Sequence, residues 1–194
     1  MNIVTVTYNS NFHYIRPDIS LNRDGNDYFC PDGITDFTVA PFIFIRIDKA
    51  GKSVGAKFAQ RYYSRIGYGL NLTAKSLIDN TVPQSFFTAN SLDNSTYVSE
   101  LFLPEEFPFN KINESLKQFV KQLQEKSNNP AQDNFWALTD SQTLKEIFAR
   151  KMEQITKLSS IRTGDFIALE LCNHVKLHPD SIVNFGDISF TLKS

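Results

Sequence analysis

The sequence predicts an α+β protein that is rich in β-structure, and three observations predict it. The run FTVAPFIFIRI, residues 37–47, alternates between two largely apolar faces, as a central β-strand does. Residues 111–127 and 140–160 instead carry apolar side chains at helical spacing. The order along the chain is strands, then two helices, then strands, which favours an α+β fold over a regular alternation of strands and helices.

The elements of the first half follow from local signals. Residues 2–8 alternate well enough to form a strand. Residues 48–51, DKAG, form a hairpin-type turn after the central strand. Residues 54–72 contain a short helix or turn followed by another strand, and residues 73–77 begin a helix.

The second half opens with the two predicted helices. Residues 111–127 read as an amphipathic helix, and Asp140 or Ser141 is the N-cap of the next one. After it, the Gly-Asp turn at residues 164–165 leads into a strand. A last pair of strands surrounds Gly186-Asp187.

Composition and charge exclude several classes of protein. The chain has 194 residues, of which 41% are apolar, enough for the core of one domain. A net charge of -1 argues against a nucleic-acid interface and against a polybasic membrane tether. The N-terminus lacks the pattern of a signal peptide, and no apolar stretch approaches the roughly 18 residues of a membrane span. Two distant cysteines indicate reduced thiols, so a cytoplasmic protein is expected.

Side-chain chemistry alone singles out no site. There is no P-loop, no dinucleotide-binding glycine motif and no nucleophile elbow. His174 and His178 are four residues apart but flank a proline-containing segment, so they read as solvated loop histidines. Cys172 and His174 would share one side of a strand, but no third group orients them. The aspartates lie in turn contexts, where carboxylates commonly bond their own backbone.

Four segments occur in an order that resembles the catalytic domain of the fumarylacetoacetate hydrolase family: RPDISL, FIFIRIDKAGKSVGAKFAQRYY, GLNLTAKSL and IRTGDFIALEL. The resemblance implies a mixed β-roll or β-sandwich with a few helices, spanning residues 1–194 as a single domain. It also implies a shortened N-terminal lid region, about residues 1–15, and a dimer. Residues 107–140 are the weakest part, because the family has a strand hairpin where the local pattern here predicts helix. Family members hold Mg²⁺ or Mn²⁺ with three carboxylates, and the metal stabilises the enolate of an α-keto acid.

Matching the family's motifs to this chain places its metal ligands on residues without a carboxylate. The two glutamates of the family's E-x-E strand fall on Ala40 and Phe42, and its aspartate falls on Asn71. Among the other matched pocket positions, Thr73 stays as in the family's pattern, and Arg16 keeps the charge of the family's lysine. Lys75, Gln84 and Glu170 differ from the family's residues.

The resemblance therefore predicts a catalytically degenerate protein without a metal cofactor, in a structural, regulatory or partner-binding role. Its expected partner is a second copy or an active paralogue, and neither nucleic acid nor membrane is expected. Two alternatives stay open. One is a divergent metal-independent hydrolase, isomerase or decarboxylase acting on a small keto acid, and the other is a small-molecule binding module. Asp36 and Asp48 are the first candidates for replacement carboxylates, because no glutamate precedes Glu100.

Overall fold

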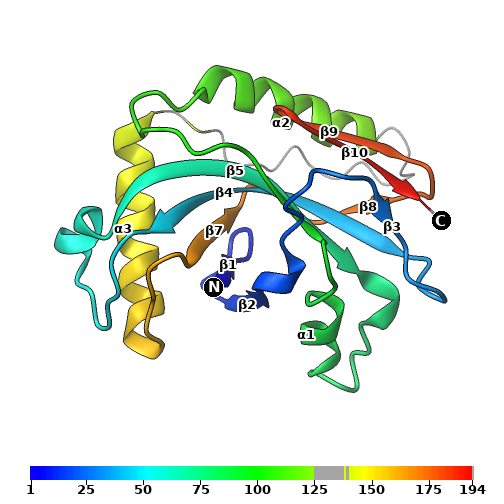
Figure 1. Cartoon of the computed structure of the whole chain (residues 1–194), viewed down its shortest axis with the longest axis horizontal. Helices are drawn as coiled ribbons and strands as arrows, with labels where there is room; N and C mark the ends of the chain where they lie inside the picture. The colour runs from blue at the N-terminus through cyan, green and yellow to red at the C-terminus, as the bar shows by residue number, and fades with distance from the viewer. Residues whose placement is uncertain (125–137, 139, 194) are drawn as a thin grey trace.

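An arched sheet of seven strands forms the centre of the molecule (Figure 1). The computed structural model describes residues 1–124, 138 and 140–193. The strand order is β2-β1-β7-β4-β5-β6, and β8 pairs with β4 beside this path. The strands are β1 (Asn2–Val6), β2 (His13–Pro17), β4 (Phe37–Ile47), β5 (Tyr63–Ala74), β6 (Thr96–Val98), β7 (Phe166–Glu170) and β8 (Val175–Leu177).

A smaller sheet and three α-helices complete the fold. The small sheet contains β3 (Tyr28–Phe29), β9 (Ile182–Phe185) and β10 (Ile188–Lys193). Gly186 turns the chain between β9 and β10 with a φ of 61°, a conformation that glycine adopts easily. The helices are α1 (Ser85–Ala89), α2 (Phe109–Gln124) and α3 (Ser141–Leu158), with 3₁₀ turns at η1 (Asp18–Ser20), η2 (Ala56–Arg61) and η3 (Lys75–Leu77).

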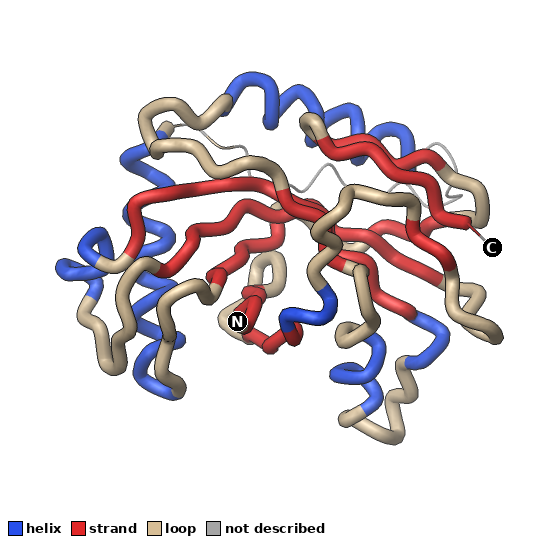
Figure 2. Tube along the Cα trace, in the orientation of Figure 1, coloured by secondary structure: helices blue, strands red, loops and turns tan. Residues whose placement is uncertain are grey.

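Helical periodicity decides how the two long helices pack. α2 buries Ile112, Leu116 and Phe119 along one stripe and lies with β9 and β10 over the convex side of the arch (Figures 1 and 2). The predicted cap of α3 is confirmed, because the Asp140 carboxylate accepts a hydrogen bond from the Thr143 backbone N–H at 2.8 Å. Together, the two sheets and the helices confirm the expected α+β, β-rich fold.

The N-terminal residues are part of the sheet. β1 pairs in parallel with β7 and antiparallel with β2, so most of the expected lid region forms two strands. After β2 and η1, Leu21 forms a parallel bridge with Thr96 of β6.

Two expectations need correction. Residues 109–124 form a helix, so the family's hairpin is wrong there, because a continuous apolar stripe at helical spacing dominates. Residues 73–74 still belong to β5, and the turn after them is a short 3₁₀ helix. The last residues of the predicted 111–127 helix lie outside the described residues. Within the described part of the chain, no helix combines the length and apolarity needed to cross a membrane.

Candidate functional site

The strand register brings the three expected metal-ligand positions together. Ala40 lies directly opposite Asn71 of β5, and Phe42 lies directly opposite Glu170 of β7. Opposite residues in an antiparallel pair place their side chains on the same side of the sheet. We call this side, which carries Thr38, Ala40, Phe42 and Phe44 of β4, the inner face.

Phenyl rings fill the middle of the inner face. Phe42 and Phe44 are completely or almost completely buried, and their ring centroids lie 5.9 Å apart. Phe42 faces Gly69 across the β4–β5 pair, where an added methyl group would overlap the Phe42 ring and the Tyr97 carbonyl oxygen. The glycine thus makes room for an apolar ring at one of the expected ligand positions.

Arg16 extends from β2 into the space beside Asn71. Its side chain is completely buried, and every nitrogen of the guanidinium group donates a hydrogen bond to an uncharged oxygen. Nε donates to Thr96 Oγ1 at 2.8 Å, Nη1 to Asn90 Oδ1 at 3.0 Å, and Nη2 to Leu72 O at 2.9 Å and to Ser95 Oγ at 2.6 Å. Burial lowers the pKa of Arg16, while the nearby Tyr14 and Glu170 raise it. Among the described residues no carboxylate forms an ion pair with this guanidinium.

Asn71 belongs to the same network. The Thr96 hydroxyl that accepts from Arg16 donates to Asn71 Oδ1 at 3.1 Å, so one hydroxyl separates the amide oxygen from the guanidinium. The Asn71 amide nitrogen is buried and has no hydrogen-bond partner among the described residues. Mg²⁺ and Mn²⁺ need several oxygen ligands, including carboxylates. An alanine, a phenylalanine and an amide already bonded through oxygen do not fit such a cation.

Asp36 and Asp48, the two candidate replacement carboxylates, each interact with another side chain. Asp36 lies 3.4 Å from the Lys176 ammonium group, and Asp48 accepts a hydrogen bond from the Ser64 hydroxyl at 2.7 Å. Within residues 1–124, 138 and 140–193, no three His, Cys, Asp or Glu side chains are grouped so that they would hold a metal ion.

A cavity of about 280 Å³ opens at the end of the inner face. Three of the expected site residues, Thr73, Lys75 and Glu170, line it. The rest of the wall comes from the segment after β1, from β4, from the end of the η3 turn, from α1 and from the residues after β7. These parts contribute Thr7, Tyr8, Thr38, Ile78, Phe86, Asn173 and His174.

The other expected site residues do not line this cavity. Arg16, Ala40, Phe42 and Asn71 are completely buried, and Gln84 is exposed at the start of α1. The candidate site is therefore smaller than the resemblance implies, and its deep part is filled by protein.

A line of hydrogen bonds crosses the cavity wall. Glu170 is 1% exposed, and one of its oxygens accepts from the Tyr14 hydroxyl at 3.1 Å and lies 2.9 Å from His174 Nε2. The other ring nitrogen, His174 Nδ1, lies 3.3 Å from the Thr38 hydroxyl. When Nε2 donates to the carboxylate, Nδ1 of a neutral ring is the acceptor for the Thr38 proton. A hydroxyl, an imidazole and a carboxylate are thus joined in series.

The expectation of a solvated His174 is wrong, because Glu170 and Thr38 hold its ring in the cavity wall. Cys172 does not pair with it: burial, with the Glu170 charge adding, raises the pKa of the Cys172 thiol to about 12. Burial also raises the pKa of Tyr14 strongly, and the Glu170 charge adds to this effect, so the phenol stays protonated and donates to Glu170. The Lys75 ammonium group has no hydrogen bond or ion pair with any described residue, so it gives the cavity an available positive charge.

Sequence reasoning missed Thr38 and His174. Glu170 and His174 are four residues apart, but the intervening chain is not helical, so the usual reading of that spacing does not apply. Thr38 reaches His174 only because β8 pairs with the beginning of β4 and brings the segment before it alongside.

Comparison with solved structures identifies proteins that share this architecture. A protein from Yersinia pestis assigned to the fumarylacetoacetate hydrolase family superimposes with a TM-score of 0.67 at 12% identity, over 98% of this chain and 91% of that one. A fumarylpyruvate hydrolase from Pseudomonas aeruginosa, in complex with Mn²⁺ and pyruvate, gives 0.67 at 10% identity, over 100% and 89%. No family model matches the sequence, and no curated protein is similar to it in sequence. At these identities the likeness establishes the fold alone: this chain has the fold of the fumarylacetoacetate hydrolase family.

Proposed function

We propose that this protein is catalytically degenerate and has lost the metal-dependent chemistry found in proteins of this fold. It serves as a regulatory or partner-binding protein and retains a binding site for a small organic acid. The observation that carries the proposal is the Arg16 guanidinium, buried beside Asn71 and bonded to neutral oxygens. A positive charge fixed in this position repels a second cation, and a low-dielectric interior strengthens the repulsion.

Electrostatics and ligand chemistry support the same conclusion. The three matched ligand positions supply no negative charge, so these positions do not offset the cost of removing a divalent cation from water. Phe42 places a hydrocarbon ring where an oxygen donor is required. The loss of one metal ligand could reflect a change of specificity. The loss of all three ligands, together with a buried arginine beside them, removes the basis for the metal-dependent reaction.

The remaining cavity has the size and charge for a small organic acid. Its volume of about 280 Å³ lies near the lower end of ligand sites. Lys75 supplies an unpaired ammonium group, and Thr38 and Thr73 supply hydroxyl groups. Phe86 and Ile78 provide apolar wall. We infer that a carboxylate of the ligand pairs with Lys75.

One observation favours a second candidate, a metal-independent reaction on a small keto acid. Thr38, His174 and Glu170 are hydrogen-bonded in series and all line the cavity. In this arrangement His174 takes a proton from the Thr38 hydroxyl or from a water molecule, and Glu170 orients the ring and stabilises the imidazolium.

Calorimetric titration with Mn²⁺, in the presence of oxalate as an enolate mimic, tests the loss of metal chemistry. The fumarylpyruvate hydrolase of Pseudomonas aeruginosa, whose structure contains Mn²⁺ and pyruvate, is the positive control. We expect no saturable heat from this chain. Saturable binding of Mn²⁺ in the micromolar range would overturn the proposal.

Two further measurements separate the candidates. Oxalate binding without metal, followed by NMR, should weaken in Lys75→Met and remain unchanged in Lys117→Met, which removes an exposed lysine on α2. If oxalate binds neither wild type nor variant, the small-acid site is wrong. Turnover of pyruvate or oxaloacetate in EDTA, abolished by His174→Gln, would establish the second candidate and exclude a purely regulatory role.

The proposed protein partner, a second copy or an active paralogue, has a suitable edge to bind. β2 ends the sheet, so one side of it lacks a neighbouring strand, and Ile15 on it is 44% exposed. An exposed apolar edge strand favours pairing with another chain. Light scattering after size exclusion should give a dimer for wild type and a monomer for Ile15→Lys, with Leu158→Lys, at an exposed apolar position on α3, as the control. The expected cytoplasmic location stays a prediction.

A further inference from the structure

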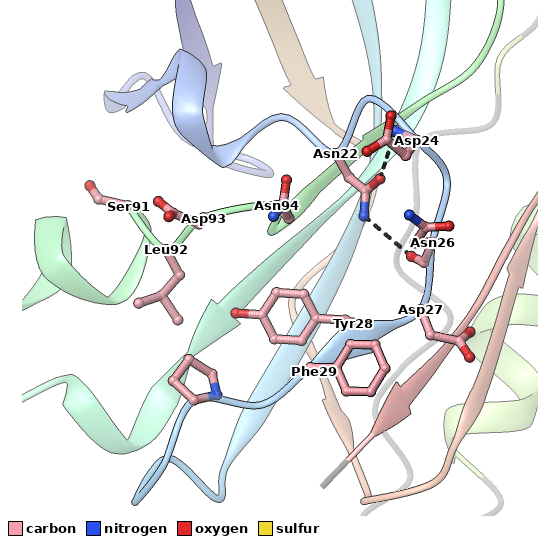
Figure 3. Close-up of a pocket in the computed structure, with 11 residues that line it drawn as sticks. Asn22, Asp24, Asn26, Asp27, Tyr28, Phe29, Ser91, Leu92, Asp93 and Asn94 are labelled. Atoms are coloured by element: carbon pink, nitrogen blue, oxygen red, sulfur yellow. Dashed lines mark hydrogen bonds between the residues drawn. The ribbon is translucent and has the colours of Figure 1, made fainter.

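A second cavity lies between residues 22–31, which include β3, and residues 91–94 (Figure 3). Its volume is about 550 Å³. None of its lining residues was expected to take part in function, and none lines the smaller cavity.

Negative charge dominates its lining. Asp24, Asp27 and Asp93 line the cavity, and no lysine, arginine or histidine does. Asp27 accepts a hydrogen bond from the Thr191 backbone N–H and lies 3.7 Å from the Lys193 ammonium group. The carboxylates of Asp24 and Asp93 have no partner among the described residues. A ligand of this cavity must therefore supply hydrogen-bond donors and positive charge.

A tyrosine whose hydroxyl group has no partner among the described residues supplies the second, independent observation. Tyr28 is 3% exposed, yet its hydroxyl has no hydrogen bond to any described residue. Figure 3 shows the hydroxyl pointing across the cavity toward Leu92 and the 91–94 segment. Burial, with Cys30 and then Asp93 adding and Arg16 opposing, raises the pKa of Tyr28 to about 12, so the phenol stays neutral. A neutral phenol hydroxyl that no described residue binds is free to accept a hydrogen bond from a ligand and to donate one.

The loop that carries these groups is held by its own hydrogen bonds. Asn22 Oδ1 accepts from the backbone N–H of Gly25 at 2.8 Å, and Asn22 Nδ2 donates to Asn26 O at 3.2 Å. The Tyr97 hydroxyl donates to the same carbonyl at 2.8 Å. The wall is thus preorganised, which lowers the entropy cost of binding.

From these features we propose that the cavity binds a small aliphatic amine, with an ammonium group between Asp93 and the Tyr28 hydroxyl. The methylene chain of the ligand packs against Leu92 and Phe29, whose ring is 71% exposed. The Phe29 ring also offers its face to a positive charge. Because the described residues contain no metal-holding group of carboxylates, the spaced charges of an organic cation fit better than a metal ion.

Calorimetry with spermidine and with cadaverine tests this site, and 1,5-pentanediol is the uncharged probe of similar length. We expect saturable binding of the amines at moderate ionic strength and no binding of the diol. Equal binding of amine and diol, no amine binding, or displacement of the amine by an equal concentration of Mg²⁺ would each overturn the proposal.

Variants locate the bound amine. Asp93→Asn and Tyr28→Phe should each weaken binding by about tenfold or more, since each removes one contact to the ammonium group. Glu106→Gln, which removes an exposed carboxylate outside the cavity, should leave binding unchanged. Unchanged affinity in both cavity variants would mean that amines bind elsewhere on the surface. Tyr28→Phe retains the ring, and circular dichroism checks that each variant is folded.

Discussion

Replacing Arg16 with alanine is expected to destabilise the protein strongly, because Arg16 is a structural cation at the centre of the inner face. The guanidinium group donates to five acceptor atoms: Thr96 Oγ1, Asn90 Oδ1, Leu72 O, Ser95 O and Ser95 Oγ. These atoms belong to β5, β6 and the segment between α1 and β6, so the side chain connects three parts of the fold.

The magnitude follows from the donors that remain after the change. Asn90 Oδ1 keeps the Thr73 hydroxyl at 2.7 Å, and Ser95 O keeps the Leu72 backbone N–H at 2.8 Å. Three acceptors lose their principal donor, at a cost of about 1 kcal/mol or more each. Loss of packing around a large buried side chain adds to this cost, and relief of the desolvated charge offsets part of it. We expect the free energy of unfolding to fall by about 3–5 kcal/mol.

Urea unfolding followed by circular dichroism measures the change. Arg16→Lys, which keeps the charge but offers fewer and differently placed donors, should fall between alanine and wild type. Arg150→Ala, at an exposed position on α3, should stay within about 0.5 kcal/mol of wild type. An Arg16→Ala protein as stable as this control would refute the structural role, and the argument against a cation beside Asn71 would lose its main support.

Three other predictions test packing and charge. Gly69→Ala should lower the free energy of unfolding by about 1–3 kcal/mol, because the methyl group enters filled space, whereas Gly55→Ala, where space is available, should not. Burial raises the pKa of both thiols, so Ellman's reagent should modify Cys30 slowly and Cys172 only after unfolding. The Lys111 ammonium group, with Tyr68, holds the pKa of Asp187 below its ordinary 3.8. This interaction stabilises the folded protein above about pH 4, and the stabilisation is lost as the pH falls through the lowered pKa of Asp187 in the folded state. Asp187→Asn should lack this acid-dependent loss of stability.

Local sequence patterns predicted most of the secondary structure. The alternation in residues 37–47 became β4 with those bounds, and Asp140 caps α3 as expected. These features depend on neighbours in the sequence, which is why they can be read without a fold. The same reasoning predicted a helix at residues 111–127 where the family has a hairpin, and α2 (Phe109–Gln124) confirms a helix there.

The candidate site could be predicted only in part. Ala40 and Asn71 come together because strand pairing follows the hydrophobic pattern, and that pattern is visible in the sequence. The cavity wall could not be predicted in this way. His174 contacts Thr38 because β8 pairs with β4, although the two residues are 136 positions apart in the sequence. No local signal distinguishes such a histidine from a solvated one.

The sequence by itself determined that no glutamate precedes Glu100, so no register within residues 38–47 supplies the two glutamates of the family's E-x-E strand. It also determined which segments form strands and helices, because hydrophobic period and capping are local properties. Only the tertiary structure decided that Arg16 lies beside Asn71, that Glu170 holds His174, and that the Tyr28 hydroxyl faces a cavity unpaired. Those arrangements depend on how distant strands close around the inner face, and the free energy of burying a charge or a hydroxyl depends on that closure.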